Sequence, residues 1–264
     1  MSKIALSVVI LAKNEEKRIE DCIKSVEEWA SEIIVIDDES TDNTSRLAKE
    51  LGAKVLVQRM DVEGKHRNWA YSKTDNEWVL SLDADERLTE ELKDEMESTL
   101  ASAPEFNAFT IPRRNFIGDY WIRWGGMYPS AQLKLFRKDK FKWEEVEVHP
   151  RAFLDGKCGH LKGDLIHYTY KDWASFLGKL NNQTTLEAKK WYKLSLTNPK
   201  KAGYKMNLLH ALWRTFDRFF RAFIAKRGYR DRFIGFMVAY FSSLYQIVSY
   251  AKYRDLIKKD EKST

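Results

Sequence analysis

Four apolar segments of strand length alternate with segments of helical spacing over the first 90 residues, and this alternation constrains the fold more than any other feature. The strand-length segments are 5–12, 32–37, 54–58 and 77–82. Between the first two, Ile19, Cys22 and Val26 recur at three and four residues, as on one face of a helix. Strands that alternate with helices predict a parallel sheet with right-handed crossovers. The continuous apolar run at 5–12 further predicts that the sheet is covered on both faces.

Polar and acidic residues stand where three of these strands end. They are Asn14 and Glu15 after the first, Asp37 and Asp38 at the end of the second, and Asp83 and Asp85 after the fourth. Ligands of open parallel sheets bind outside the carboxyl ends of the strands, so we expect these residues to line one site. Because clustered carboxylates repel one another, we expect a divalent cation, Mg²⁺ or Mn²⁺, that they share with a diphosphate. The alternative is that some of them only cap helices, with Asn14 starting the first helix and Asp42 the second.

The sequence lacks the motifs that are typical of several classes of protein. Neither G-x-G-x-x-G nor G-x-x-x-x-G-K-[ST] occurs, which argues against dinucleotide-binding and P-loop proteins. Cys22 and Cys158 have no metal-ligand spacing, and Cys22 falls on the apolar side of its predicted helix, so we interpret it as a small buried hydrophobe. With 44% apolar and 32% charged residues, we expect a globular chain, and we expect no signal peptide.

The pattern changes after Pro104. Short strands are predicted at 106–112 and 132–136, and an aromatic, glycine-rich loop separates them at 118–129. A further strand is predicted at 143–150, and the pattern is helical from about residue 173 onward. The second part of the chain is therefore expected to extend the sheet and then to continue as helices.

Taken together, these motifs resemble the family 2 glycosyltransferases of the GT-A fold. The resemblance rests on the strand-end segments 12–15, 37–42 and 82–86, and on Arg67-Asn68-Trp69-Ala70, Gly125-Gly126-Met127-Tyr128-Pro129, Leu133-Lys134-Leu135-Phe136-Arg137, Val148-His149-Pro150 and Ile166-His167-Tyr168-Thr169-Tyr170. It covers essentially the whole chain and extends to the bacterial branch that includes lipopolysaccharide inner-core β-1,4-glucosyltransferases. Ser130 and Pro150 depart from that branch, whose members commonly have Asp and Glu at these positions.

The resemblance implies an α/β fold, Rossmann-like, with a mainly parallel sheet, flanking helices and a C-terminal helical region that associates with a membrane. We expect a GT-A catalytic domain at 1–172, with a nucleotide-sugar half at 1–103 and an acceptor half at 104–172. A helical, basic and aromatic region is expected at 173–264.

The implied activity is inverting, metal-dependent transfer of a hexose, with glucose favoured, from a UDP-sugar to a lipid-linked or lipopolysaccharide-core saccharide. One alternative is a sugar-nucleotidyltransferase, which usually needs a glycine-rich loop that is missing after the first strand. The other is a non-catalytic, membrane-associated scaffold with the same fold, against which the intact Asp83 and Asp85 argue.

For the nucleotide, the resemblance implies roles at two strand ends. Asp38, with Asp37 beside it, would accept a hydrogen bond from the uracil base. The segment that contains Ala12, Asn14 and Glu15 would line the base and the ribose.

For the ribose, the metal and the phosphates, the implied residues lie near the end of the fourth strand. Asp83 and Ala84 would contact the ribose, and Asp83 and Asp85 would hold the divalent cation. Lys65 and Arg67 are suitably placed to meet phosphate; the alternative is that they lie on a solvated helix face.

An inverting transfer needs a group that takes the proton of the acceptor hydroxyl. We expect it in the segment 143–150, where alternation in a strand would place Glu145, Glu147 and His149 on one face. Glu147 and Glu145 are the preferred candidates for the catalytic base, followed by His149, and the alternative is an edge strand with solvated acids. The aromatic residues that either stack on sugar rings or only pack are Trp121, Trp124, Tyr128 and Trp143.

The net charge of +6 is concentrated in the C-terminal region, where ten Lys or Arg stand against two Asp between residues 200 and 232. Leu209, Trp213 and Phe216 alternate there with Arg214 and Arg218, a pattern typical of amphipathic helices on anionic membranes. The alternative is a helix packed on the sheet with a solvated basic face. Nucleic acid is not an expected partner, because no binding motif occurs in this region.

The uncharged segment 233–251 reaches the length of a transmembrane helix, but serines, tyrosines and a glutamine dilute it. We therefore expect a helix that lies in the interface or packs on its neighbour rather than one that spans. The helices at 205–252 are predicted to bind an anionic membrane surface, which makes the protein peripheral, or monotopic, on the cytoplasmic face of the inner membrane.

Overall fold

The structure is a computed structural model that describes residues 3–102, 104–146, 151–198 and 206–261. The chain forms two compact units, residues 1–114 with 130–168, and residues 115–129 with 169–264. The division at residue 172 stays a prediction. The compact units differ from it, because residues 115–129 group with the C-terminal helices.

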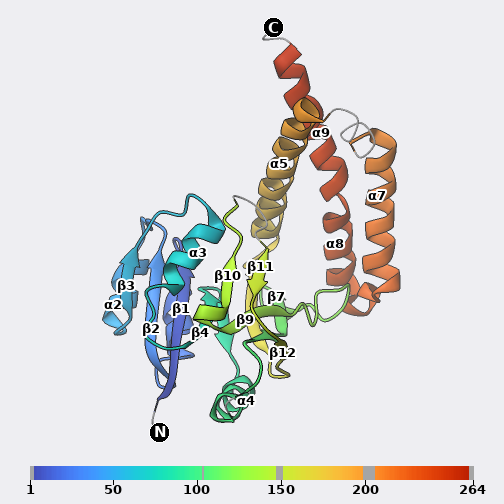
Figure 1. The fold of residues 1–264 in the computed structure, drawn as a ribbon. Coiled ribbons are helices and arrows are strands. Elements are labelled where there is room, and N and C mark those ends of the chain that lie inside the picture. Colours follow the sequence, from blue (N-terminus) through green and yellow to red (C-terminus); the bar gives the residue numbers. More distant parts are fainter. Residues whose placement is uncertain (1–2, 103, 147–150, 199–205, 262–264) are drawn as a thin grey trace. The chain divides into compact units, whose positions relative to one another are not determined.

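The first unit is built on a sheet of seven strands. These are β1 (Ile4–Ala12), β2 (Ala30–Asp37), β3 (Lys54–Val57), β4 (Trp78–Asp83), β6 (Ala108–Ile111), β9 (Gln132–Arg137) and β12 (Cys158–His160). Their order across the sheet is β12-β6-β9-β4-β1-β2-β3 (Figure 1). β1 pairs in parallel with β2 and with β4, and β2 with β3, which confirms the predicted parallel sheet. β9 runs antiparallel to both β4 and β6.

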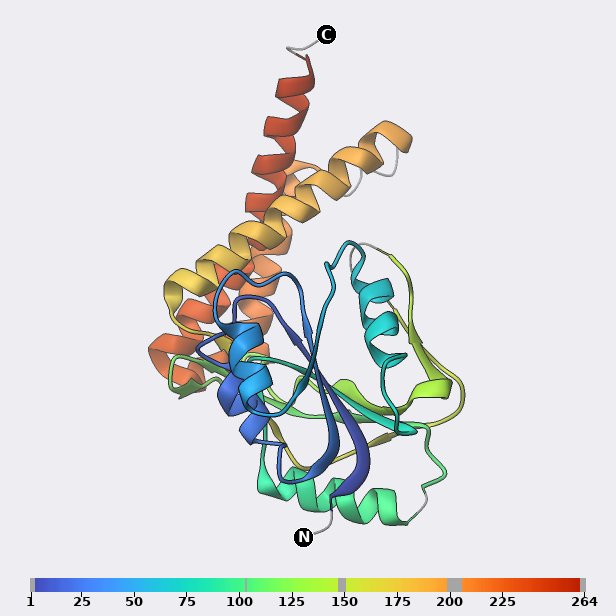
Figure 2. The same cartoon turned by 90° about the vertical axis from the view of Figure 1, so that its left-hand side faces the viewer.

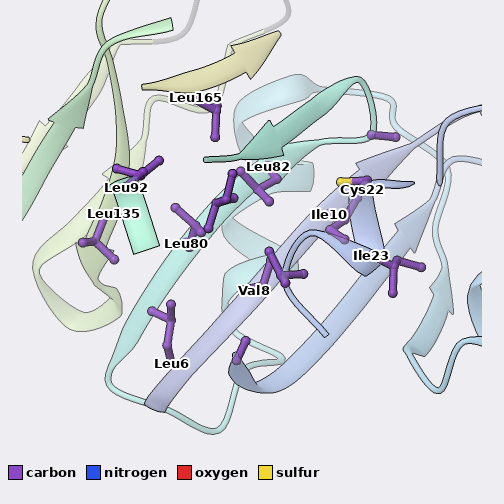
Figure 3. Packing of buried hydrophobic residues seen from close by; sticks show 14 of the residues in the cluster. Leu6, Val8, Ile10, Cys22, Ile23, Leu80, Leu82, Leu92, Leu135 and Leu165 are labelled. Carbon is purple, nitrogen blue, oxygen red and sulfur yellow. The ribbon is translucent and has the colours of Figure 1, made fainter. Parts of the chain in front are cut away.

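Helices cover both faces of this sheet. They are α1 (Ile19–Lys24), α2 (Thr44–Glu50), α3 (Glu63–Tyr71) and α4 (Glu90–Ala101). Val8 and Ile10 of β1 pack on one face with buried residues of α1, α2 and α4, as Figure 3 shows for part of this cluster. Val9 packs on the other face with Ala70 and Tyr71 of α3. Figure 2 accordingly shows α3 on one side of the sheet and α1 and α2 on the other. Burial of both faces explains the continuous apolar run of the first strand.

The expectation for Cys22 is confirmed, and the one for Asn14 is wrong. Cys22 is fully buried as a small hydrophobe, and this burial raises the pKa of its thiol to about 12. Thr89 caps α4, accepting a hydrogen bond from the Leu92 N–H at 3.3 Å. Asn14 does not cap the first helix, because α1 begins only at Ile19 and Asn14 has a left-handed backbone with φ of +54°.

Shorter strands form further antiparallel pairs. β5 (Glu86–Leu88) pairs with β13 (Leu165–Tyr170), β7 (Arg113–Ile117) with β8 (Tyr120–Trp121), and β10 (Phe141–Trp143) with β11 (Ala152–Leu154). A single 3₁₀ turn, η1 (Lys138–Lys140), leads from β9 into β10.

The second unit is mainly helical, as its sequence predicts. Its helical elements are α5 (Trp173–Thr197), α7 (Leu208–Phe220), the π-helical turn η2 (Arg221–Ala225), the 3₁₀ turn η3 (Gly228–Asp231), α8 (Arg232–Ser243) and α9 (Tyr245–Glu261). α5 packs along α9, where Trp191 meets Tyr253 edge to face at 6.2 Å. The stretch Gly228–Asp260 is long and apolar enough, by length and composition alone, to cross a membrane, and 33% of its most apolar window is buried.

Candidate active site

Strand register brings the predicted acidic residues to one edge of the sheet. Ala12 pairs with Asp37 on one side of β1, and Leu11 pairs with Asp83 on the other. The chain continues this contact beyond the strands, since Ala84 donates its N–H to the Leu11 carbonyl at 3.1 Å. Because one strand separates them, the ends of β2 and β4 lie roughly 10 Å apart. The two acidic turns therefore flank the end of β1, at the point where the strand order reverses and where such sheets bind ligands.

The turn after β2 holds two buried carboxylates. Asp37 accepts hydrogen bonds from the Ser40 N–H at 2.9 Å and from the Ser45 hydroxyl, so it shapes the turn. Asp38 accepts from the Met60 N–H and is paired with Lys13, both at 2.8 Å. Burial acts to raise the pKa of Asp38, but the hydrogen bonds from Lys13 and from the Met60 N–H, together with the charge of Lys13, outweigh it and hold this pKa below its usual range. Asp38 is thus an ionised acceptor at the rim of the sheet.

The loop after β1 is fastened to this turn. Asn14 accepts a hydrogen bond from the Thr41 N–H and donates its own N–H to the Ser40 hydroxyl, each at 2.8 Å. The Glu15 N–H donates to the Thr44 hydroxyl at 2.8 Å. Asparagine tolerates the left-handed backbone that this loop needs. Asn14 and Glu15 therefore belong to the same rim as Asp38, and the carboxamide of Asn14 holds two loops together.

Asp83 lies in a network of buried charges. Lys134 of β9 contacts it at 3.0 Å and Arg67 of α3 at 3.4 Å. Lys134 also binds Glu86 at 2.6 Å, and Glu86 is completely buried. Burial alone would raise the pKa of Asp83, but Lys134 and Arg67 hold it well below its usual range. Burial likewise acts to lower the pKa of Lys134, but Asp83 and Glu86 raise it. Asp83, Arg67 and Lys134 are therefore charged at neutral pH.

Asp85 has different partners. His167 of β13 lies 3.6 Å from its carboxylate and Arg18 lies 3.7 Å away. Burial acts to raise the pKa of Asp85, but the interaction with His167 lowers it. The two residues after β4 thus face different surroundings, since Asp83 lies between two cations and Asp85 lies next to an imidazole.

These contacts correct the reason given for a metal. The strand-end carboxylates do not need a divalent cation to remain together, because Lys13, Arg18, Arg67 and Lys134 neutralise them. Among the described residues, no group of three or more His, Cys, Asp or Glu could hold a metal ion. The carboxylate of Asp85 and the imidazole of His167 nevertheless fit a cation that takes its remaining ligands from a diphosphate and water.

The two residues predicted to bind phosphate, Lys65 and Arg67, both lie on α3 but have different surroundings. Arg67 reaches Asp83, and the Asp83 charge raises the pKa of Arg67 against the effect of burial. Lys65 is exposed on the same helix and makes no described contact with Asp83. Of the two, the structure therefore brings only Arg67 to the strand-end acids.

The predicted strand at 143–150 ends earlier than expected. β10 stops at Trp143, and the Val146 N–H bonds to the Glu144 carbonyl at 3.0 Å, two residues back. This tight turn breaks the extended backbone, so the predicted alternation is wrong for Glu144 to Val146. Glu145 is exposed, and its carboxylate accepts from Asn68 of α3 at 3.4 Å. Glu147 and His149 lie outside the described residues.

The segment after β10 is fixed to α3 by backbone contacts. Asn68 bonds to both the N–H and the carbonyl of Trp143, at 2.8 and 3.0 Å. Gly64 lets the two backbones approach, since a Cβ at this position would lie 1.9 Å from the Glu144 carbonyl oxygen. These contacts therefore hold the segment that contains Glu145 against α3, the helix that also carries Arg67.

Replacing Gly64 by alanine is expected to lower the free energy of unfolding by about 1–3 kcal/mol, because the new methyl group overlaps the Glu144 carbonyl. Urea unfolding measures this change. Gly178→Ala is the matched control, since Gly178 lies in α5 with nothing within 4 Å of the added carbon. This control is expected to gain about 0.5–1 kcal/mol from helix propensity. Equal stability of the Gly64→Ala and wild-type proteins would contradict the tight contact.

The four predicted aromatic residues do not share one compact unit. Trp143 belongs to the first unit and packs edge to face on Phe141, with ring centroids 5.4 Å apart. Trp121, Trp124 and Tyr128 belong to the second unit, where Trp121 meets Tyr128 at 5.5 Å. Trp143 thus packs within the first unit, the other three aromatic residues lie in the second unit, and a stacking role stays a prediction for all four.

Comparison with known proteins identifies the family. The family model described as glycosyl transferase family 2 matches residues 7–154, more than half of the chain. The chain belongs to this family. It is therefore a glycosyltransferase, and inversion of the sugar is typical of the family. The family expected from the motifs is confirmed, as is the mainly parallel α/β fold.

Two of the relatives found by sequence are named as glycosyltransferases. An uncharacterized glycosyltransferase of Rickettsia typhi is 29% identical over 96% of this chain and 88% of its own length. The lipopolysaccharide core biosynthesis glycosyltransferase LpsC of Rhizobium meliloti is 27% identical, over 80% of this chain and 84% of its own. A crystal structure of glucosyl-3-phosphoglycerate synthase from Mycobacterium tuberculosis, with Mn²⁺, UDP-glucose and phosphoglyceric acid, matches 41% of this chain and 44% of that one. Its TM-score is 0.37 at 24% identity.

Four ionisable residues of the site had no role in the sequence-based prediction. They are Arg18, Glu86, Lys134 and His167. Glu86, Lys134 and His167 stand inside segments that carry the family resemblance, which was the available signal. No sequence signal pointed to Arg18, because a single arginine before a helix is common.

Proposed function

We propose that this family 2 glycosyltransferase moves a hexose, glucose in the first instance, from a UDP-sugar to a lipid-linked or lipopolysaccharide-core saccharide, with inversion. The observation that carries the proposal is the position of Asp38, Asp83 and Asp85 around the end of β1. Ionised carboxylates at this position can accept hydrogen bonds from a uracil and a ribose, and the cationic side chains beside them can bind a diphosphate. The name of the Rhizobium meliloti relative supports the saccharide acceptor.

Residues at the ends of β1 and β2 would bind the nucleoside. Asp38 would accept a hydrogen bond from the uracil, and its ion pair with Lys13 keeps it ionised for this role. Asp37 would hold the turn that presents Asp38. Ala12, Asn14 and Glu15 would line the base and the ribose from the loop after β1.

Residues after β4 would bind the ribose and the diphosphate. Asp83 and Ala84 would contact the ribose. Asp85 and His167 would hold the cation. Asp83 fits the role of a cation ligand less well, because it is already paired with Lys134 and Arg67. When bound, Mg²⁺ or Mn²⁺ would neutralise charge on the departing diphosphate. Arg67 supplies a fixed positive charge beside Asp83, whereas Lys65 would have to swing in from solvent.

The catalytic base is proposed to come from the segment that follows β10. Glu147 and Glu145 are the preferred residues, and His149 is the third. Glu145 is held at α3 through Asn68, on the helix that carries Arg67. One of these groups would take the proton of the acceptor hydroxyl as its oxygen attacks the sugar from the face opposite the diphosphate.

A panel of nucleotide sugars tests the donor. With lipid-linked saccharide and Mn²⁺ or Mg²⁺, the enzyme is expected to release UDP from UDP-glucose at least tenfold faster than GDP or CMP from their sugars. Chelation of the cation should stop the release. Pyrophosphate released from UTP and a sugar phosphate would instead indicate a nucleotidyltransferase. Absence of any turnover, with the fold intact, would indicate a scaffold.

The place of action is proposed to be the cytoplasmic face of the inner membrane. In this proposal residues 1–172 carry the chemistry, and the helices of 173–264 associate with anionic lipid as a peripheral, monotopic element. The apolar stretch Gly228–Asp260 and the basic residues around it support this arrangement. A lipid-linked acceptor and a soluble donor would meet at such a surface.

A further inference from the structure

An exposed apolar stripe runs along α7 and into the turn that follows it. Its members are Leu209, Leu212, Trp213, Phe216, Phe220 and Ile224. Trp213 and Phe216 are 60% and 64% exposed, although large aromatic side chains are usually well buried. Because the spacing is three or four residues, these side chains share one face over roughly 20 Å of helix. A contiguous apolar stripe of this length marks a surface that contacts something apolar.

The surroundings of the stripe are positively charged. Residues 206–236 contain seven Lys or Arg and two Asp. Asp217 is paired with Arg214 and Arg221, and Asp231 is buried, so the region keeps a net positive charge. An anionic lipid bilayer offers both an apolar interior and negative headgroups. A second copy of this chain would instead oppose cation to cation.

The longest apolar helical stretch, Gly228–Asp260, is in part packed inside the unit. Ser243, Gln246 and Ser249 of α8 and α9 are buried. Lys252 donates to the carbonyl of Asn181 at 2.7 Å and to the Thr185 hydroxyl at 2.8 Å, both on α5. A transmembrane position of this segment would break these contacts. They argue against a spanning α8–α9 segment, and the exposed stripe on α7 is then the longest apolar surface among the described residues of this unit that can contact lipid.

The turn between α7 and α8 also holds the loop 118–129. Asp231, 3% exposed, accepts from the Trp124 N–H at 2.8 Å and from the Tyr120 hydroxyl at 3.2 Å. The Gly125 N–H donates to the Lys226 carbonyl at 3.0 Å. The Arg230 guanidinium covers the Trp124 ring at 4.5 Å. The loop and the turn therefore form one packed element within the second unit.

We propose that the α7 stripe and the α7–α8 turn rest on an anionic bilayer, and that Asp231 positions the loop 118–129 at this surface to meet the membrane-bound acceptor. The second part rests on the proposed function, because it assumes a lipid-linked acceptor. The loop suits saccharide contact through the faces of its aromatic rings that Arg123 and Arg230 do not cover. Asp231 is a positioning residue, since it acts through the loop.

Vesicle co-sedimentation of the full chain tests the first part. The wild-type protein is expected to bind vesicles of phosphatidylcholine with phosphatidylglycerol, and at least tenfold less to phosphatidylcholine alone or at high salt. Replacing Trp213 and Phe216 by serine should weaken binding at least tenfold. The matched control replaces Leu186 and Leu196 of α5, which are 50% and 64% exposed, and should bind like the wild type.

Equal binding of the stripe and control variants would overturn the bilayer contact. Light scattering gives a second test. If the wild-type protein is a dimer and the stripe variant is a monomer, the bilayer contact is also overturned, because the stripe would then be an interface between copies. Release of UDP from UDP-glucose is measured in the same preparations. If it persists while vesicles are not bound, the membrane inference and the proposed place of action fail, whereas the proposed transfer reaction stands.

Asp231→Ala tests the second part. This variant is expected to bind vesicles normally and to hydrolyse UDP-glucose normally, while the KM for the membrane-bound acceptor rises at least tenfold. Tyr120→Phe removes one of the two bonds without emptying the buried site and should show a smaller rise. Unchanged acceptor KM in both variants would overturn the role of Asp231, and equal losses of UDP-glucose hydrolysis and acceptor transfer would overturn it as well.

Discussion

Replacing Asp85 by asparagine is expected to lower sugar transfer by about 10²–10³-fold, the cost typical of losing one charge-stabilising group in an active site. Asp85 lies beside His167, and the two are the proposed ligands of the cation. The amide keeps the size of the carboxylate but loses its charge and half of its acceptor oxygens. Release of UDP from UDP-glucose, at saturating acceptor, measures the effect.

Asp94→Asn is the control for this substitution. Asp94 is exposed on α4, away from the strand ends that carry the site, so its amide should retain the wild-type rate. Circular dichroism of both variants checks that the fold persists. Wild-type turnover in Asp85→Asn would show that the carboxylate does not take part.

Replacing Lys134 by methionine is expected to lower the free energy of unfolding by about 3–5 kcal/mol, the typical cost of removing one partner from a buried ion pair. Lys134 binds both Asp83 and Glu86, and Glu86 is completely buried. Without Lys134, the Glu86 charge stays in a low-dielectric site with a cation only at 3.6 Å, from Arg113. Urea unfolding at neutral pH measures the loss.

Two further proteins separate charge from packing at this position. Lys140→Met removes an exposed lysine from a surface pair with Asp155 and should leave the stability unchanged. Adding Glu86→Gln to Lys134→Met should recover part of the loss, because the buried charge is then gone. A double variant that is no more stable than Lys134→Met alone would attribute the loss to packing.

The first four strands could be predicted from the sequence because each carries a strong local signal. Continuous apolar residues at 5–12 require burial on both faces, and Val8 and Val9 are indeed buried on opposite sides of the sheet. The acids that follow these strands were also predictable, since parallel strands end at one edge. Their meeting at the end of β1 is a direct consequence of that topology.

The residues that pair with these acids could not be predicted, because they lie on segments that are distant in the sequence. Lys134 lies on an antiparallel strand and His167 on a strand paired with β5, and neither pairing leaves a mark in the sequence around Asp83 or Asp85. Without these partners the acids suggested unbalanced negative charge. The structure instead balances it with lysine and arginine side chains.

Local exceptions explain the remaining errors. Asn14 looked like a helix cap, but asparagine also tolerates a left-handed backbone, and the loop uses that freedom. The strand predicted at 143–150 ends at Trp143, because a tight turn closes at Glu144. Separately, residues 115–129 group with the C-terminal helices, where Tyr120 and Trp124 bond to Asp231, more than a hundred residues away.

Calorimetric titration of UDP into the enzyme, with and without Mn²⁺, tests the central claim most directly. If the strand-end acids hold a cation and a diphosphate together, UDP should bind at least tenfold more tightly with Mn²⁺, and Asp85→Asn should remove this difference. Equal affinity with and without the cation, or undetectable UDP binding in both conditions, would contradict the account.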